Sequence, residues 1–137
     1  MKHYILDANA LIRYVRNIEG ANKVRAIFRQ SEQGLASISM SVVNLGEAYY
    51  IFMRRGGERA AWDTVNALQQ GIAFVPVEFE LAIQAARIKE HYKLAYADSF
   101  AAALAIRANG ILVSADPDFV KLGKSLQLLK LPRYVES

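Results

Sequence analysis

The segment HYILDANALI, at residues 3–12, places an acidic residue where a buried strand turns into a helix. Residues 4–6 form an apolar and aromatic run typical of a buried strand, and Asp7 follows directly. From Ala8 onward, apolar residues recur at the spacing of an amphipathic helix. In open α/β sheets, sites lie at the edge formed by the carboxyl ends of the strands. The segment therefore predicts such a sheet, with Asp7 at its carboxyl edge.

Apolar runs and helical patterns alternate along the rest of the chain. We expect strands at about residues 3–6, 35–39, 72–77, 111–114 and 126–131. We expect helices at about residues 8–16, 21–33, 42–55, 78–92 and 97–109, with shorter ones near 62–68 and after 118. Pro76 indicates that the third strand lies at a sheet edge or ends there. This order predicts a three-layer α/β/α sandwich with a mainly parallel central sheet, as a single domain over residues 1–137.

Composition excludes several kinds of site. The chain has no Cys, which excludes disulfides, thiolate zinc sites and cysteine nucleophiles, and its two His make a His-rich metal site improbable. The longest uncharged stretches, residues 33–46 and 64–77, are shorter than the roughly 20 apolar residues of a membrane helix. The N-terminal residues do not resemble a signal peptide. We therefore expect a cytoplasmic protein that does not enter a membrane.

Five acidic residues stand at strand ends or within otherwise apolar helix patterns: Asp7, Glu47, Asp98, Asp116 and Asp118. Each has a simpler explanation when taken alone, since aspartates cap helices and start turns, and a helical glutamate can face solvent. As a set they are more informative. Two of them follow apolar strands that would end at one sheet edge, and the helical acids can reach that edge.

Carboxylates crowded at one edge would raise one another's pKa values, and a divalent cation would relieve that repulsion. A ligand set of oxygen atoms selects hard ions such as Mg²⁺ or Mn²⁺, which activate water for phosphodiester cleavage. The formal net charge is +4, and setting the five acids aside leaves 8 acidic against 17 basic residues. A basic surface around an acidic site suits a polyanionic substrate.

Four motifs, ILDANALI, NLGEAYY, YADSFAAALA and LVSADPDF, resemble in order those of PIN-domain ribonucleases, most closely the VapC-type toxins of type II toxin–antitoxin pairs. The resemblance implies four catalytic, metal-binding acids and one auxiliary metal ligand: Asp7, Glu47, Asp98 and Asp116, with Asp118. It also implies that Asn9 and Ser114 orient the carboxylates, and Ser114 stands where the family often has Thr. Further implications are Mg²⁺ or Mn²⁺ as cofactor, RNA as substrate, a cognate antitoxin as partner and a homodimer.

Two arginines are candidates for contacts with substrate phosphates. Arg54 follows Glu47 by two helical turns on the same face, and Arg13 follows Asn9 by one. The alternative is that both lie on solvated helix faces.

Three other functions compete with a ribonuclease. A phosphohydrolase with an aspartyl nucleophile would resemble an Asp-x-Asp site, but Asn9 stands at the second position. A phosphorylated receiver domain usually has clustered acids after its first strand, where this chain has Asp7 alone. A catalytically silent RNA-binding or scaffold module of the same fold is the third. The intact acidic set argues against it, because a silent module would tolerate the loss of acids.

Overall fold

A five-stranded sheet, in the order β3-β2-β1-β4-β5, forms the centre of the molecule. The computed structural model describes residues 1–133. All four strand pairings are parallel. The strands are β1 (Lys2–Leu6), β2 (Ala36–Ser41), β3 (Ala73–Val75), β4 (Ile111–Ser114) and β5 (Gln127–Lys130).

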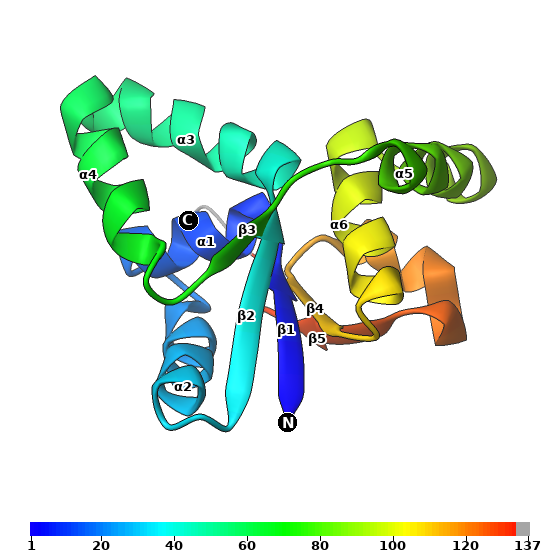
Figure 1. Cartoon of the computed structure of the whole chain (residues 1–137), viewed down its shortest axis with the longest axis horizontal. Coiled ribbons are helices and arrows are strands. Elements are labelled where there is room, and N and C mark those ends of the chain that lie inside the picture. Colours follow the sequence, from blue (N-terminus) through cyan, green and yellow to red (C-terminus); the bar gives the residue numbers. More distant parts are fainter. Residues whose placement is uncertain (134–137) are drawn as a thin grey trace.

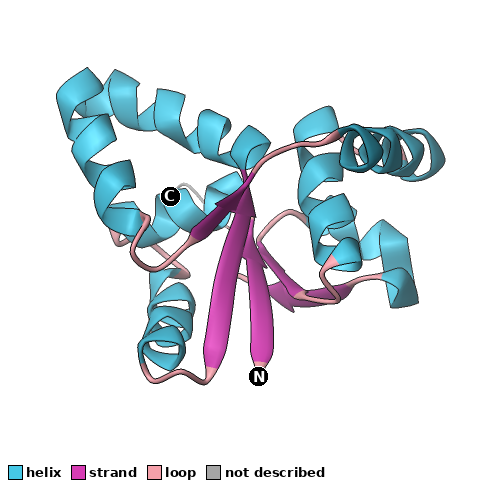
Figure 2. Ribbon diagram, in the orientation of Figure 1, coloured by secondary structure: helices cyan, strands magenta, loops and turns pink. Residues whose placement is uncertain are grey.

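Helices cover both faces of the sheet (Figures 1 and 2). One face carries α1 (Ala8–Arg16), α2 (Ala21–Glu32), α3 (Val42–Gly56) and α4 (Glu58–Leu68). The other carries α5 (Phe79–Tyr92), α6 (Tyr96–Arg107) and the 3₁₀ segment η1 (Pro117–Ser125). Each layer has its own apolar core against the sheet. The predicted three-layer sandwich is therefore confirmed, and the sheet is parallel throughout the described residues.

The central strand β1 is where the order of the sheet reverses. The chain passes from β1 to β2 and β3 on one side, and later to β4 and β5 on the other. The register pairs Leu6 with Val113, so the residues that follow, Asp7 and Ser114, lie side by side at the carboxyl edge of the sheet. A crevice outside the carboxyl ends of the strands at such a reversal is where open α/β sheets bind ligands.

The observed element boundaries differ from the predicted ones where tertiary pairing decides them. Strand β2 continues to Ser41 because residues 39–41 pair with β3, and the Ser41 side chain then caps α3 by accepting from Val43 N at 3.2 Å. Strand β3 ends before Pro76, which lacks the N–H needed to continue a ladder, and it lies at a sheet edge as predicted. Helix α4 begins at Glu58 because Gly57, at φ 88°, ends α3 at once.

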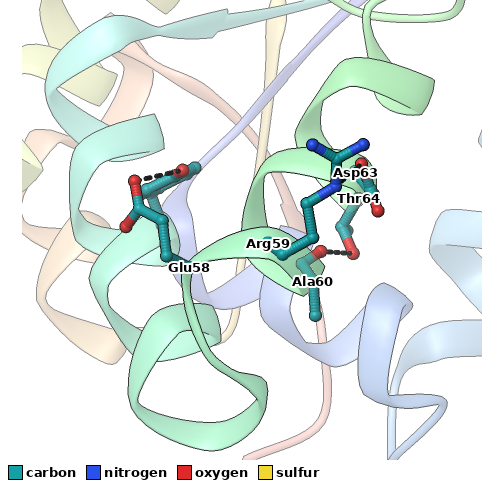
Figure 3. Close-up of polar contacts among 6 residues, drawn as sticks. Glu58, Arg59, Ala60, Asp63 and Thr64 are labelled. Atoms are coloured by element: carbon teal, nitrogen blue, oxygen red, sulfur yellow. Dashed lines mark hydrogen bonds and ion pairs between the residues drawn. The ribbon is translucent and has the colours of Figure 1, made fainter.

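Helices α3 and α4 form a hairpin that projects from the sheet (Figure 1). Surface contacts reinforce its second helix: Arg59 pairs with Asp63 at 3.3 Å, and the Thr64 hydroxyl donates to Ala60 O at 2.9 Å (Figure 3). Such exposed pairs contribute less than about 1 kcal/mol each. Within the described part of the chain, no helix combines the length and apolar character that crossing a membrane requires.

Replacing Gly110 by Ala is expected to destabilise the protein by about 1–3 kcal/mol. A Cβ at Gly110 would lie 2.8 Å from His3 O and 3.3 Å from Ile5 Cγ1, so the α6–β4 turn would have to move away from β1. The matched control is Gly46→Ala in α3, where a Cβ meets nothing within 4 Å and helix propensity should add about 0.5–1 kcal/mol. Urea unfolding measures both. Equal midpoints would show that β1 does not constrain this turn.

Candidate active site

Asp7 lies at the junction of β1 and α1 and is only 4% exposed. Its Oδ1 accepts from Ala10 N at 2.8 Å, so Asp7 is the N-cap of α1. This is the simpler explanation that the sequence allowed for Asp7. Its Oδ2 accepts a hydrogen bond from the Ser114 hydroxyl at the end of β4. The two bonds fix the carboxylate at the sheet edge. Asp7 can therefore cap the helix and also belong to a site at this edge.

Four acids and Asn9 line one pocket of about 520 Å³ at this edge, called the acidic pocket below: Asp7, Asn9, Glu47, Asp98 and Asp116. They come from the β1–α1 junction, α1, α3, α6 and the start of η1. The structure thus brings together the four acids that the sequence singled out as a set. Ser114 lies behind the pocket, where it also accepts from Asp116 N at 3.0 Å.

Glu47 is held by a residue that the sequence analysis missed. Asn44, one turn earlier in α3, is 1% exposed, and its Nδ2 donates to Glu47 Oε1 at 3.3 Å and to Ala97 O at 3.0 Å. This amide therefore connects α3 to the first turn of α6, which carries Asp98. The sequence signal that could have identified Asn44 is its position three residues before Glu47, which places both side chains on one face of the helix.

Crowding and burial raise the pKa of two acids in the pocket. Burial raises the pKa of Asp7 to about 6, although the bonds from Ser114 and Ala10 act to lower it. Burial also raises the pKa of Asp98 to about 7, and the negative charges of Asp116 and Asp7 add to this effect. At pH 7 Asp7 is therefore mostly ionised and Asp98 about half ionised, and strongly shifted acids in a pocket are typical of functional sites.

The geometry and the family comparison agree on the kind of domain. A family model described as "PIN domain" matches residues 4–125, nearly the whole chain. The chain belongs to the PIN-domain family. No curated protein sequence matches the chain.

Solved structures show the same fold for this PIN domain. The DNA-bound VapBC complex of Salmonella typhimurium aligns with a TM-score of 0.74 and 13% identity, covering 95% of this chain and 98% of that one. VapBC-1 of nontypeable Haemophilus influenzae aligns at 0.73 and 15% identity, covering 93% and 97%. VapC20 of Mycobacterium tuberculosis, a toxin that cleaves the sarcin–ricin loop, aligns at 0.70 and 17% identity, covering 88% and 95%.

The donor set of the acidic pocket fits a hard divalent cation. Its acidic ligands are all carboxylates, and the side chains beside them are an amide and a hydroxyl. Among residues 1–133, no group of three or more Asp, Glu or His side chains is placed so that it could hold a metal ion by itself. A cation that keeps several of its waters, as Mg²⁺ does, needs only one or two direct carboxylates.

Two residues singled out by the sequence lie outside the acidic pocket. Asp118 is about half exposed, with its carboxylate 3.7 Å from Lys121 Nζ, while its backbone N–H donates to Asp116 Oδ1 at 2.9 Å. Arg54 lies one turn beyond the pocket on α3, beside a smaller hollow, with its guanidinium 6.0 Å from the centre of the Tyr50 ring. Their assigned roles stay predictions.

Arg13 lines the acidic pocket but is 2% exposed, so the alternative of a solvated arginine is wrong. Its Nη1 donates to the backbone carbonyls of Glu19, at 3.2 Å, and Pro132. A guanidinium engaged in this way is poorly placed to hold a substrate phosphate.

Proposed function

We propose that this PIN domain is a divalent-metal-dependent endoribonuclease and the toxin of a toxin–antitoxin pair. The observation that carries the proposal is the acidic pocket, where four carboxylates from separate elements meet at the carboxyl edge of the sheet. Helix capping by Asp7 does not require the other carboxylates beside it, and each raises the cost of ionising its neighbours. Mg²⁺ or Mn²⁺ is the cofactor that suits them.

Each residue of the pocket has a distinct part in the proposed reaction. Asp7, Asp98 and Asp116 would hold one cation, and Glu47 would complete the site or hold a second ion. Such a cation lowers the pKa of a bound water from about 15.7 towards neutrality and offsets phosphate charge. Ser114 and Asn44 keep the carboxylates of Asp7 and Glu47 in place. Attack by water, without use of the ribose 2′-hydroxyl, leaves a 5′-phosphate and a 3′-hydroxyl.

The partners follow from the structures that share the fold. Two of those reported above are VapBC complexes, in which a toxin is paired with an antitoxin. We extend this to the present chain as a cognate antitoxin that silences it, a homodimeric toxin and action in the cytoplasm. The silent module remains the second candidate, and Asn9 still disfavours an aspartyl phosphohydrolase.

The proposal is tested by incubating the purified protein with a labelled RNA in Mg²⁺, in Mn²⁺ and in EDTA. We expect cleavage with either metal, products that carry 5′-phosphates, and none in EDTA. Asp98→Asn should lower the rate by at least about 100-fold, since even residues that only support metal ligands cost 10–100-fold. The control is Asp63→Asn, an exposed acid on α4 (Figure 3). Full activity in EDTA or in Asp98→Asn, or 2′,3′-cyclic phosphate ends, would refute the proposal.

Arg54→Ala is expected to weaken RNA binding and to flatten its dependence on salt, with metal affinity unchanged. The hollow beside Arg54 shares Ile51 with the acidic pocket, so a strand that crosses the pocket can reach it. One lost contact with a phosphate of single-stranded RNA lowers the slope of log Kd against log salt by about 0.7. Arg59→Ala, on the exposed surface of α4, is the control. An unchanged slope would remove Arg54 from the substrate path.

A further inference from the structure

Two arginines line the acidic pocket, one buried and one exposed. Arg13 is buried in α1, whereas Arg133 is exposed and follows β5 by three residues. Among the described residues, neither forms an ion pair with a carboxylate within 4.0 Å. The pocket therefore has one cation fixed inside the protein and one exposed cation that no carboxylate of residues 1–133 pairs with.

The buried arginine holds the chain segment that carries the exposed one. Arg13 Nη1 donates to Pro132 O, across 119 positions of sequence, and to Glu19 O in the α1–α2 turn. Its Nε is buried without a hydrogen-bond partner in residues 1–133. A buried guanidinium is costly when its donors are incompletely used. An ion placed there for stability alone would be expected to have a carboxylate partner.

The packing around this contact leaves little freedom to the residues before Arg133. Leu131 is 4% exposed, and its N–H donates to Ser114 O at 2.9 Å, so the same serine that holds Asp7 also holds this segment. Gly20 lies against this contact at φ +92°, which favours glycine, and a Cβ there would lie a tight 3.2 Å from Arg13 Nη1. The two residues before Arg133 are therefore held by hydrogen bonds to Ser114 and Arg13.

We propose that Arg133 binds the RNA phosphate next to the scissile one, and that Arg13 is a positioning residue that holds Arg133 there. This rests on the proposed function of the acidic pocket. To bind a phosphate, an arginine needs to be exposed and to have unused donors, and Arg13 is not exposed. Arg133 is exposed on the pocket wall, and the described residues do not engage its donors. Arginine suits a phosphate because its planar fork matches two oxygens.

The position of Arg133 also indicates a path for the RNA strand across the pocket. The acidic pocket adjoins the hollow beside Arg54, since Ile51 lines both. A single strand bound by both arginines would cross the carboxylates with a phosphate on each side of the cleaved bond. Holding both neighbours fixes the scissile phosphate without adding positive charge at the metal ligands.

The test is binding of a fluorescein-labelled single-stranded RNA, with Ca²⁺ in place of Mg²⁺ and RNA integrity checked on gels. Arg133→Ala should raise Kd by roughly 5- to 20-fold and lower the salt slope by about 0.7, the value for one phosphate. Arg133→Lys should restore the slope. Metal affinity, measured separately by calorimetry with Mn²⁺, should not change. A wild-type slope in Arg133→Ala overturns the inference even if the protein hydrolyses RNA, whereas a wild-type protein that binds no RNA overturns the proposed function as well.

A double-mutant cycle tests the role of Arg13. Arg13→Lys keeps the charge, but its side chain is one atom shorter and falls short of the two carbonyls that Arg13 Nη1 reaches. It should therefore lower the slope as Arg133→Ala does, and the double variant should be no lower than either. Slopes that fall additively, to about 1.4 below wild type, would show that Arg13 binds phosphate directly and would overturn the positioning role. Circular dichroism checks that Arg13→Lys is folded. If it is not, the slope of Arg133→Ala and its rescue by Lys decide the proposal.

Discussion

The metal-free protein is expected to become less stable as the pH rises from 5 to 8. Asp7 has a pKa of about 6 when folded, against 3.8 for an ordinary aspartate, so the folded state binds its proton more tightly than the unfolded state. The stabilisation from that proton is complete below about pH 4 and is lost as the pH rises through 6. Between pH 5 and 8, Asp7 should account for about 1–2 kcal/mol of unfolding free energy. Asp98, with a pKa of about 7, acts in the same direction.

The other shifted groups do not disturb this interval. The Arg107 side chain and the N–H of Leu81 help lower the pKa of Glu78, and burial raises the pKa of Tyr49 from 10.0, so both titrate outside pH 5–8. Urea unfolding in EDTA at pH 5 and pH 8 measures the effect. Saturating Mg²⁺ at pH 8 should restore the lost stability, because a bound cation favours the folded state by mass action. Higher stability at pH 8 in EDTA would contradict the assignment of Asp7 as a buried, strained acid.

The sheet and the acidic set could be predicted because local patterns determine them. Apolar runs identify strands, and parallel strands place the residues at their carboxyl ends together, so Asp7 and Asp116 could be paired before any coordinates were known. Glu47 and Asp98 followed because an acid in an apolar helix needs a partner.

The sequence analysis did not foresee the surroundings of three residues: Arg13, Asn44 and Asp118. Arg13 is buried by a carbonyl 119 positions away, and no spacing within α1 reveals that partner. Asn44 acts through Ala97 O, a backbone atom that carries no sequence signal. Asp118 was associated with the site by its neighbour Asp116, but a capped 3₁₀ turn sends the second carboxylate towards Lys121. Residue types at strand ends can thus be predicted, whereas the direction of a long side chain cannot.

Asp7→Asn is expected to stabilise the metal-free protein while removing its nuclease activity. Asparagine caps a helix as well as aspartate does, so α1 should keep its first turn, and the buried negative charge disappears. Unfolding free energy at pH 8 in EDTA should rise by about 1–3 kcal/mol. The gain should shrink at pH 5, where the wild-type carboxyl is already mostly protonated. Metal-dependent RNA cleavage should fall at least 100-fold, as for other losses of a metal ligand.

This pair of opposite effects separates a functional acid from a structural one. If Asp7 served the fold as a cap and a partner of Ser114 alone, its replacement would cost stability or leave it unchanged, and activity would fall only as folding failed. The exposed control Asp63→Asn should change stability by less than about 0.5 kcal/mol and leave cleavage intact. A gain in stability together with lost cleavage requires that the charge of Asp7 be unfavourable for the apo fold and necessary for the chemistry. Functional sites commonly show this trade between stability and activity.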